Sequence, residues 1–192
     1  MANLKGSQTE KNLLKAFAGE SQARNRYTYF AKQARKEGYH QIAALFEETA
    51  DNEKQHAKIF FKFLESGEGL EITAMYPAGK IGTTLENLKA AAEGENEEHT
   101  ILYPGFAKVA KEEGFPEVAA AFTLIAKVEV EHEQRYLKLA ENVETDHVFH
   151  KDGGSRWKCR VCGHVHEGKD APAVCPTCKH DQGHFELKEM NY

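Results

Sequence analysis

Two copies of the pattern Glu-x-x-His constrain the fold of this 192-residue chain more than any other feature. They are Glu53-x-x-His56 and Glu129-x-x-His132, and each lies on a ladder of apolar residues spaced alternately four and three apart. That spacing is typical of the inward-facing stripe of a helix. A glutamate and a histidine therefore occupy core positions twice, where Leu or Ile is expected. Because burying unpaired carboxylates is costly, the pattern predicts a metal ion that compensates for all four groups.

The two motifs belong to an internal repeat. The matching segments are FAKQARKEGY (30–39) and FAKVAKEEGF (106–115). The same offset relates Tyr27 to Tyr103 and the first Glu-x-x-His to the second. Glu20 corresponds to Glu95 at an offset one residue shorter, so the second half holds one extra residue between Glu95 and Tyr103. We expect this residue to widen the helix into a π-helical turn beside the metal site, where such turns are common.

Helix signals divide the first part of the chain into four helices. We expect them over about 7–37, 40–65, 83–114 and 116–143. Ser7 and Thr83 each begin a pattern with the form of a capping box, and Pro116 fits the first turn of the last helix. Residues 66–83 are rich in glycine and proline and are expected to cross along the outside. Two helical hairpins joined by one long crossover give a four-helix bundle of ferritin-like connectivity.

The bundle supplies the residues of a carboxylate-rich metal site. A di-iron bundle takes one glutamate from each of two helices and a Glu-x-x-His from each of the other two. Glu20 and Glu95 are the matching single glutamates here. Ligation rich in oxygen with some imidazole suits iron or manganese better than a soft metal. Glu98 is an added carboxylate without a counterpart in the first half, where Ala23 stands.

Other polar residues receive supporting roles. Tyr27 and Tyr103, which the repeat pairs, are expected to bond to ligand carboxylates and so fix their orientation. The histidines outside the two motifs are interpreted as solvated or capping residues. They are His40, His99, His147, His150, His180 and His184, while His164 and His166 are placed on the surface of a hairpin.

The helical period ends before the last 40 residues. Residues 150–155, HKDGGS, are typical of a linker, and short strands are expected at 157–159 and 184–187. We therefore divide the chain into a bundle domain, 1–148, and a small second domain, 153–192. The second domain is too small for an apolar core of its own, so a metal is expected to organise it.

All four cysteines lie in this tail, as two C-x-x-C pairs. They are Cys159, Cys162, Cys175 and Cys178. In a chain without a secretory signal, this spacing favours one tetrahedral four-thiolate site over disulfides. Zinc and a single iron both satisfy it. With zinc the domain is a structural staple, and with iron it is a one-electron carrier.

Composition limits the classes of function. A net charge of −5 with 41% hydrophobic residues describes a soluble globular protein. Neither part of the chain offers the basic patch of a nucleic-acid-binding protein. The N-terminus lacks the apolar stretch of a signal peptide, and no apolar run approaches the ~18 residues of a membrane span. The expected compartment is the cytosol.

Taken together, these features resemble those of rubrerythrins over essentially the whole chain. They are GESQARNRY (19–27), the two Glu-x-x-His motifs, Glu95-x-x-Glu98 and a four-cysteine tail that opens with WKCRVCG. The resemblance implies a non-haem di-iron site in the bundle, a rubredoxin-type iron centre in the tail and reduction of hydrogen peroxide to water. It also implies electrons from NAD(P)H through other redox proteins, such as a rubredoxin or a reductase. The implied assembly is a head-to-tail homodimer in which one tail serves its partner's bundle.

The same resemblance assigns the site residues. The implied di-iron ligands are Glu20, Glu53, His56, Glu95, Glu98, Glu129 and His132, and the expected catalytic residues are Glu98, His56, Tyr27 and Tyr103. Glu98 and His56 are expected to exchange on one iron as the redox state changes. With diferrous iron, replacing Glu98 by neutral His56 brings the site from one negative charge to neutrality, which costs less in a buried site.

One departure from the rubredoxin pattern lies in the tail. Only residues 163–174 separate its two knuckles, a loop much shorter than in stand-alone rubredoxins, and no aromatic closely follows the first knuckle. Two alternatives compete with the peroxidase interpretation. A ferritin-like ferroxidase or iron-storage protein would not need a dedicated electron carrier. A non-enzymatic metal-binding module would hold zinc in its tail and lack visible absorption.

Overall fold

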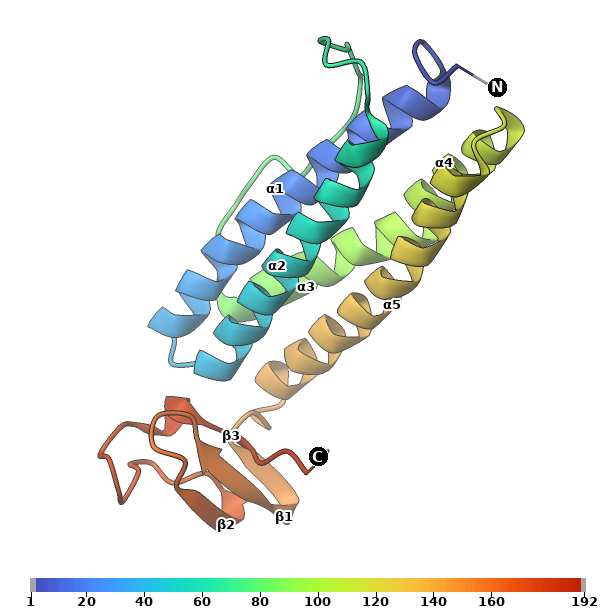
Figure 1. The fold of residues 1–192 in the computed structure, drawn as a ribbon. Coiled ribbons are helices and arrows are strands. Elements are labelled where there is room, and N and C mark those ends of the chain that lie inside the picture. The colour runs from blue at the N-terminus through green and yellow to red at the C-terminus, as the bar shows by residue number, and fades with distance from the viewer. Residues whose placement is uncertain (1–2, 191–192) are drawn as a thin grey trace.

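A long helical bundle with a small β-sheet at one end forms the structure, a computed structural model that describes residues 3–190 (Figure 1). The helical segments are α1 (Gln8–Lys36), α2 (His40–Phe63), α3 (Thr84–Glu97), the π-helical turn Glu98–Leu102, α4 (Tyr103–Glu112) and α5 (Pro116–Glu144). Because α3, the π-helical turn and α4 form one continuous rod, the bundle has four helices. The strands are β1 (His150–Cys159), β2 (Val165–Asp170) and β3 (Phe185–Leu187), with a 3₁₀ turn at Gln182–His184. The predicted ferritin-like bundle with a small β-rich tail is confirmed.

Two apolar clusters fill the bundle. One gathers around Phe30, Phe46 and Leu88, and the other around Phe60 and Phe122, all completely or almost completely buried. The residues of both Glu-x-x-His motifs belong to neither cluster, although they too are buried. The fold therefore places a polar layer inside an apolar bundle. The crossover after α2 returns along α1, as Figure 1 shows.

Helix starts and ends largely follow the sequence signals. At Thr83 the predicted capping box is present in full. At Ser7 the side chain accepts from the Glu10 amide, but the Glu10 carboxylate accepts from the Gly6 amide, so this capping box is not reciprocal. The second helix stops at Phe63, two residues before the predicted end. Its last turn gives way to extended backbone in the crossover.

The predicted π-helical turn is confirmed. It covers Glu98–Leu102, and the amide of Tyr103 donates to the carbonyl of Glu98, five residues earlier. Pro104 follows directly and brings no backbone donor of its own. The extra residue of the second half is thus absorbed as one wide turn, which lets the helix regain its register before α4.

The tail is an antiparallel sheet in the order β2-β1-β3. Residues 157–159 of β1 pair with 185–187 of β3, as predicted, although His184 lies in the 3₁₀ turn and not in a strand. The linker predicted at 150–155 is wrong, because these residues belong to β1, and its His150 and Ser155 pair with β2. The register shifts between His150 and Ser155, where Gly154 adopts a φ of +75°. Gly154 thus allows the irregular backbone at this break in the strand pairing.

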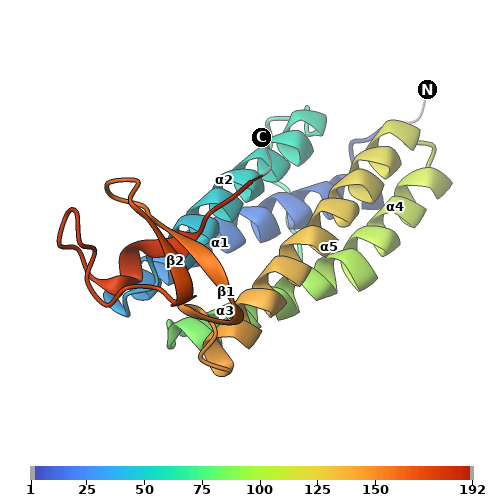
Figure 2. The same cartoon turned by 90° about the horizontal axis from the view of Figure 1, so that it is seen from below.

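The tail lies at the end of the bundle that carries the α1–α2 turn and the end of α5 (Figure 2). Trp157 and Phe185 are buried in a small cluster with two of the cysteines. Among residues 3–190, no helix is both long enough and apolar enough to cross a membrane. The division into domains at 1–148 and 153–192, whose outermost residues lie outside the described range, stays a prediction.

Candidate metal centres

The polar layer of the bundle contains two overlapping groups of metal-ligand type. One group is Glu20, Glu53, His56 and Glu129, and the other is Glu53, Glu95, Glu129 and His132. All of these residues are buried, and within each group one ligand atom per residue lies within 4.8 Å of the others. Glu53 and Glu129 belong to both groups. Each of them could therefore hold two cations, while each of the remaining glutamates and histidines could hold one.

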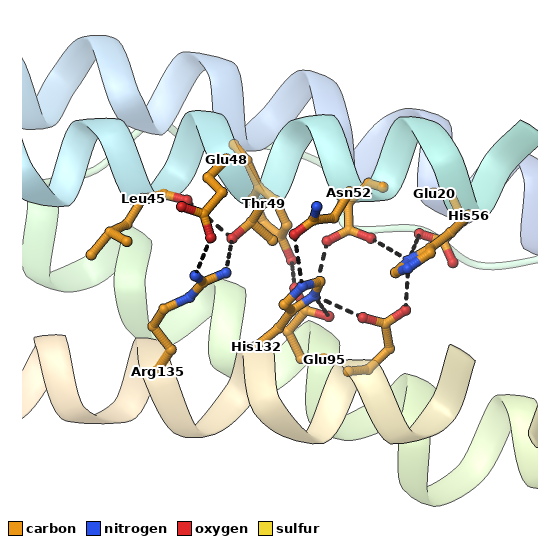
Figure 3. A network of polar contacts seen from close by, with 12 residues as sticks. Glu20, Leu45, Glu48, Thr49, Asn52, His56, Glu95, His132 and Arg135 are labelled. Atoms are coloured by element: carbon orange, nitrogen blue, oxygen red, sulfur yellow. Dashed lines mark hydrogen bonds and ion pairs between the residues drawn. The ribbon is translucent and has the colours of Figure 1, made fainter. Parts of the chain in front are cut away.

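The two groups are related by an approximate two-fold symmetry. His56 Nδ1 lies 2.9 Å from Glu53 Oε2, 2.9 Å from Glu129 Oε1 and 3.8 Å from Glu20 Oε2. His132 Nδ1 lies 2.8 Å from Glu129 Oε2, 3.2 Å from Glu53 Oε1 and 3.8 Å from Glu95 Oε2. The two imidazole rings are 6.0 Å apart, centroid to centroid. Figure 3 shows both rings pointing inward from α2 and α5.

The donor set fits metal ions. Six buried atoms in this layer lack a hydrogen-bond partner among the described residues: Glu20 Oε2, Glu53 Oε1, Glu95 Oε2, both oxygens of Glu129 and His132 Nδ1. Buried polar atoms in native proteins are almost always paired. When one cation binds a nitrogen and an oxygen at about 2.0–2.2 Å with a right angle between the two bonds, the nitrogen and the oxygen lie about 3 Å apart. The shortest distances between the histidine Nδ1 atoms and the carboxylate oxygens have this length.

The electrostatics of the metal-free layer show how strongly it demands positive charge. Burial raises the pKa of Glu95 to about 8, and the neighbouring Glu53 adds to the rise. Burial likewise raises the pKa of Glu20 well above its usual value, although His56 opposes the shift. Burial lowers the pKa of His132, but the carboxylates of Glu129 and Glu53, whose oxygens lie 2.8 and 3.2 Å from Nδ1, outweigh it and raise the pKa to about 11. Without metal, protons therefore take the place of cations.

Two tyrosines hold the terminal glutamates. The hydroxyl of Tyr27 donates to Glu95 Oε1 at 2.6 Å, and the hydroxyl of Tyr103 donates to Glu20 Oε1. Each tyrosine thus reaches from its own half of the repeat to the glutamate of the other half. The predicted contact between tyrosine hydroxyls and these carboxylates is confirmed. Burial raises the pKa of both phenols well above the ordinary value, so the hydroxyls remain donors.

The structure does not bring Glu98 into either group. Its side chain lines a cavity of about 210 Å³ between α1, the crossover and the α3–α4 rod. Tyr27, Tyr103 and Gln22 also line this cavity, and Tyr76 of the crossover covers it while donating to the carbonyl of Lys15 at 2.8 Å. Burial raises the pKa of Glu98 well above its usual value, and the charge of Glu20 adds to the effect. Glu98 therefore lies at the wall of the cavity, beside the two tyrosines that contact the carboxylate layer.

Sequence reasoning missed the contacts behind His132. Its Nε2 lies 3.3 Å from Asn52 Oδ1, so the ring can direct Nδ1 at the carboxylates and donate from Nε2. One turn further along α5, Arg135 bonds to Glu48 at 2.6 Å and to Thr49 at 2.9 Å (Figure 3). Asn52 precedes the motif glutamate directly, but no pattern in the sequence marks it as a partner of a histidine from the other half.

The four cysteines of the tail converge. Cys159 Sγ and Cys178 Sγ are 3.7 Å apart, as are Cys162 Sγ and Cys175 Sγ, and none is in a disulfide. A tetrahedral ion with metal–sulfur bonds of about 2.3 Å separates its sulfurs by about 3.8 Å. Burial opposes ionisation of Cys175, but the backbone amides of Cys178 and Thr177 outweigh it and lower the thiol pKa to about 6. The tail therefore provides a formed four-thiolate site.

Several of the remaining histidines differ from the interpretation as solvated or capping residues. His99 Nε2 lies 2.6 Å from Glu133 Oε2 in a largely buried pair. The rings of His40 and His184 stack on each other. These partners come from elements distant in the sequence, so the sequence alone does not reveal them.

Comparisons with known proteins match both parts of the chain. The family model described as Rubrerythrin matches residues 11–140, and the one described as Rubrerythrin, rubredoxin-like domain, matches residues 157–186. The curated Rubrerythrin of Porphyromonas gingivalis is 61% identical over 99% of this chain and 94% of its own length. The Rubrerythrin of Nitratidesulfovibrio vulgaris is 54% identical, with complete coverage of both chains.

Solved structures agree with the fold. A structure of nigerythrin in a mixed-valence state has a TM-score of 0.64 and 32% sequence identity, and the match covers 96% of this chain and 90% of that one. An open-pore ferritin from Archaeoglobus fulgidus reaches a TM-score of 0.61 at 17% identity, covering 74% of this chain and 87% of that one. The second likeness supports the ferritin-like bundle and nothing further.

Proposed function

The chain belongs to the rubrerythrin family, and we propose that it is a peroxidase that reduces hydrogen peroxide to water at the iron pair of its bundle. As a member of that family it is a di-iron protein, and its rubredoxin-like domain carries four cysteines that can bind iron. The main support for the proposal is the cavity beside Glu98, because Tyr27 and Tyr103 also line it and donate hydrogen bonds to Glu95 and Glu20 of the carboxylate layer. A substrate as small as hydrogen peroxide fits such an approach.

The proposed ligands follow from the geometry of the two groups. Glu53 and Glu129 would each hold both ions, since each belongs to both groups. Glu20 and His56 complete one side, and Glu95 and His132 complete the other. Glu98 is proposed as a ligand that joins the His56 side in one redox state and withdraws toward the cavity in the other. When bound, the iron pair supplies the two electrons that break the O–O bond.

The protein's own residues supply orientation and protons. Reduction of one peroxide consumes two electrons and two protons and releases two waters. Glu98 is the proposed source of a proton, because its carboxyl group lines the cavity through which the peroxide arrives. Tyr27 and Tyr103 hold Glu95 and Glu20 in place, so the terminal carboxylates keep their orientation while Glu98 moves.

Electrons reach the bundle through the tail in this proposal. Cys162 is exposed, and two exposed apolar side chains, Val161 and Val174, lie next to the cysteine knuckles. On the bundle, a hollow between α2 and α5 is lined by Asn52, Val128 and the edge of His132. We propose that the tail of a second copy docks over this hollow in a head-to-tail homodimer. The electrons then come from NAD(P)H through a separate redox protein that reduces the tail.

A spectroscopic titration tests the peroxidase proposal. The iron-loaded full-length protein is reduced without oxygen until the visible absorption of its ferric four-thiolate centre is bleached. Hydrogen peroxide is then added in steps below one equivalent. The proposal predicts rapid recovery of the absorption, with water and no oxygen as product. Absorption that stays bleached while peroxide persists would refute the proposal. Recovery at an equal rate in protein from which the bundle iron has been removed would contradict the role of the iron pair.

A further inference from the structure

The tail is seated on the bundle by a close backbone approach. The 3₁₀ turn Gln182–His184 lies against the α1–α2 turn, and a Cβ atom built on Gly183 would lie only 2.2 Å from the carbonyl oxygen of Gly38. Only glycine allows this contact. Nearby, the rings of Tyr39 and Phe149 stack with an interplanar angle of 5°. Figures 1 and 2 both show the tail at this end of the bundle. We call this contact region the seam.

Three side chains with metal-binding atoms meet at the seam. His40 is the first residue of α2, whereas Asp181 and His184 belong to the tail. The rings of His40 and His184 stack with centroids 3.8 Å apart, and His184 Nδ1 lies 3.0 Å from Asp181 Oδ1. One ligand atom from each of the three lies within 4.8 Å of the other two. Bundle and tail thus contribute to one cluster.

The atoms that face the cluster are not otherwise engaged. Among residues 3–190, no hydrogen bond reaches either ring nitrogen of His40, Nε2 of His184 or Oδ2 of Asp181.

Two arginines stand near enough to influence the cluster, but both have carboxylate partners elsewhere. Arg35 pairs with Glu47, and Arg160 pairs with Glu186. Neither therefore neutralises Asp181, whose charge is available for a bound cation. Two imidazoles with one carboxylate form a donor set that suits zinc and similar divalent ions once one ring turns out of the stack, with water in the remaining position.

We propose that His40, Asp181 and His184 bind one divalent cation of the zinc type, which fastens the tail to the α1–α2 end of its own bundle. This site is separate from the carboxylate layer and from the four cysteines. It fixes the orientation of the tail within one subunit, and with it the direction in which the four-thiolate centre faces. Its existence does not depend on the peroxidase proposal.

A zinc titration of the iron-loaded full-length protein tests the proposal, with iron content measured before and after. We expect one equivalent of zinc to bind without displacing iron, and at least tenfold weaker binding in His40→Ala and in His184→Ala. His40→Asn provides a second variant that retains a polar helix start. The matched control is His166→Ala, which removes a tail histidine that belongs to no group of metal-ligand type among residues 3–190 and should leave zinc binding unchanged.

Hydrogen exchange then separates a seam site from a site within the tail. Zinc should slow exchange of the amides in 181–184 in the unaltered protein but not in His40→Ala, because His40 is the ligand that the bundle provides. The proposal is overturned if zinc binds only by displacing iron. It is overturned equally if His40→Ala binds zinc as tightly as the unaltered protein, since the stacked histidines would then be ordinary packing.

Discussion

The two halves of the bundle site carry the same ligand types but are supported differently. On the His132 side, Asn52 lies against the outer ring nitrogen, and the neighbouring Arg135 ties α5 to α2. On the His56 side, no hydrogen bond reaches Nε2 of His56 among the described residues. The cavity and Glu98 lie near Gly19, beside Glu20 of this half.

This difference indicates that the two sides of the site have different roles. The symmetric part, made of the bridging glutamates and the terminal glutamates with their tyrosines, is suited to hold two cations in place. The π-helical turn breaks the symmetry and adds a carboxylate that the first half does not have. We infer that the His132 side is the fixed side, and that the His56 and Glu98 side is where ligation changes during turnover.

Removing a bridging glutamate should have the largest effect. In Glu129→Ala both cations lose a shared ligand, so the bundle should lose its iron while the tail keeps its own. Peroxidase activity should fall by at least about 100-fold. Metal analysis and the tail's visible absorption measure the two sites separately. The control is Glu133→Ala, one turn further on, where the residue pairs with His99. Full iron content in Glu129→Ala would contradict the proposed bridge.

Deleting one residue from the π-helical turn should come next. Removal of Ile101, whose side chain is exposed, should make the rod resemble α1 and rotate Glu98 away from the cavity. A misplacement of about 1 Å can cost about 100-fold in rate. Peroxide turnover should fall by about that factor while iron content is largely kept. Ile101→Ala retains the length of the turn and should behave like the unaltered protein. If the deletion variant were fully active, the wide turn would have no role in positioning Glu98.

Loss of the contact behind His132 should have a moderate effect. Asn52→Ala removes the partner of Nε2, and loss of such a partner typically weakens metal affinity by about 10–100-fold. Competition with a chelator measures this affinity. The neighbouring Asp51→Ala, on the exposed face of the same helix, is the matched control. Equal affinities in the two variants would mean that His132 needs no support from α2.

The smallest expected effect is the pH dependence of the metal-free protein. Because the folded pKa of His132 is about 11 and the unfolded value about 6.5, its contribution to stability is complete below pH 6.5 and is lost as the pH rises through 11. The pKa of Glu95 is raised to about 8, so its burial also reduces the stability of the folded protein as the pH rises from about 4.5 to 8. The melting temperature of the metal-free protein should therefore fall above neutrality. The iron-loaded protein should not share this loss, since metal replaces the protons. If the melting temperatures of the metal-free and the iron-loaded protein changed with pH in the same way, metal would not replace these protons.

The sequence predicted the architecture because its strongest signals are local and periodic. Apolar ladders, a capping box at Thr83 and the repeat offset are sufficient to place four helices and the π-helical turn. The linker predicted at 150–155 was wrong for a physical reason. Glycine and polar residues indicate a flexible segment, yet here both ends of the segment, His150 and Ser155, pair with β2, a strand that lies later in the chain.

The site residues that occur in both halves of the internal repeat could be predicted from the sequence. Contacts between residues of different segments could not. The repeat itself marks Glu20, Glu95 and both motifs. Asn52 facing His132, and His40 facing His184, depend on how segments far apart in the sequence meet. No spacing rule connects such residues, so a three-dimensional structure is needed to find them.

Single-turnover reoxidation of the Glu98→Ala variant tests the asymmetry most directly. Reduced, iron-loaded protein is mixed with hydrogen peroxide, and the recovery of ferric absorption is followed beside the unaltered protein and a Glu97→Ala control. The account predicts unchanged iron content and a recovery about 100-fold slower in Glu98→Ala, since a positioned acid or base typically contributes about that factor or more. Recovery at the unaltered rate with full iron content would contradict the assignment of the redox-linked chemistry to the Glu98 side.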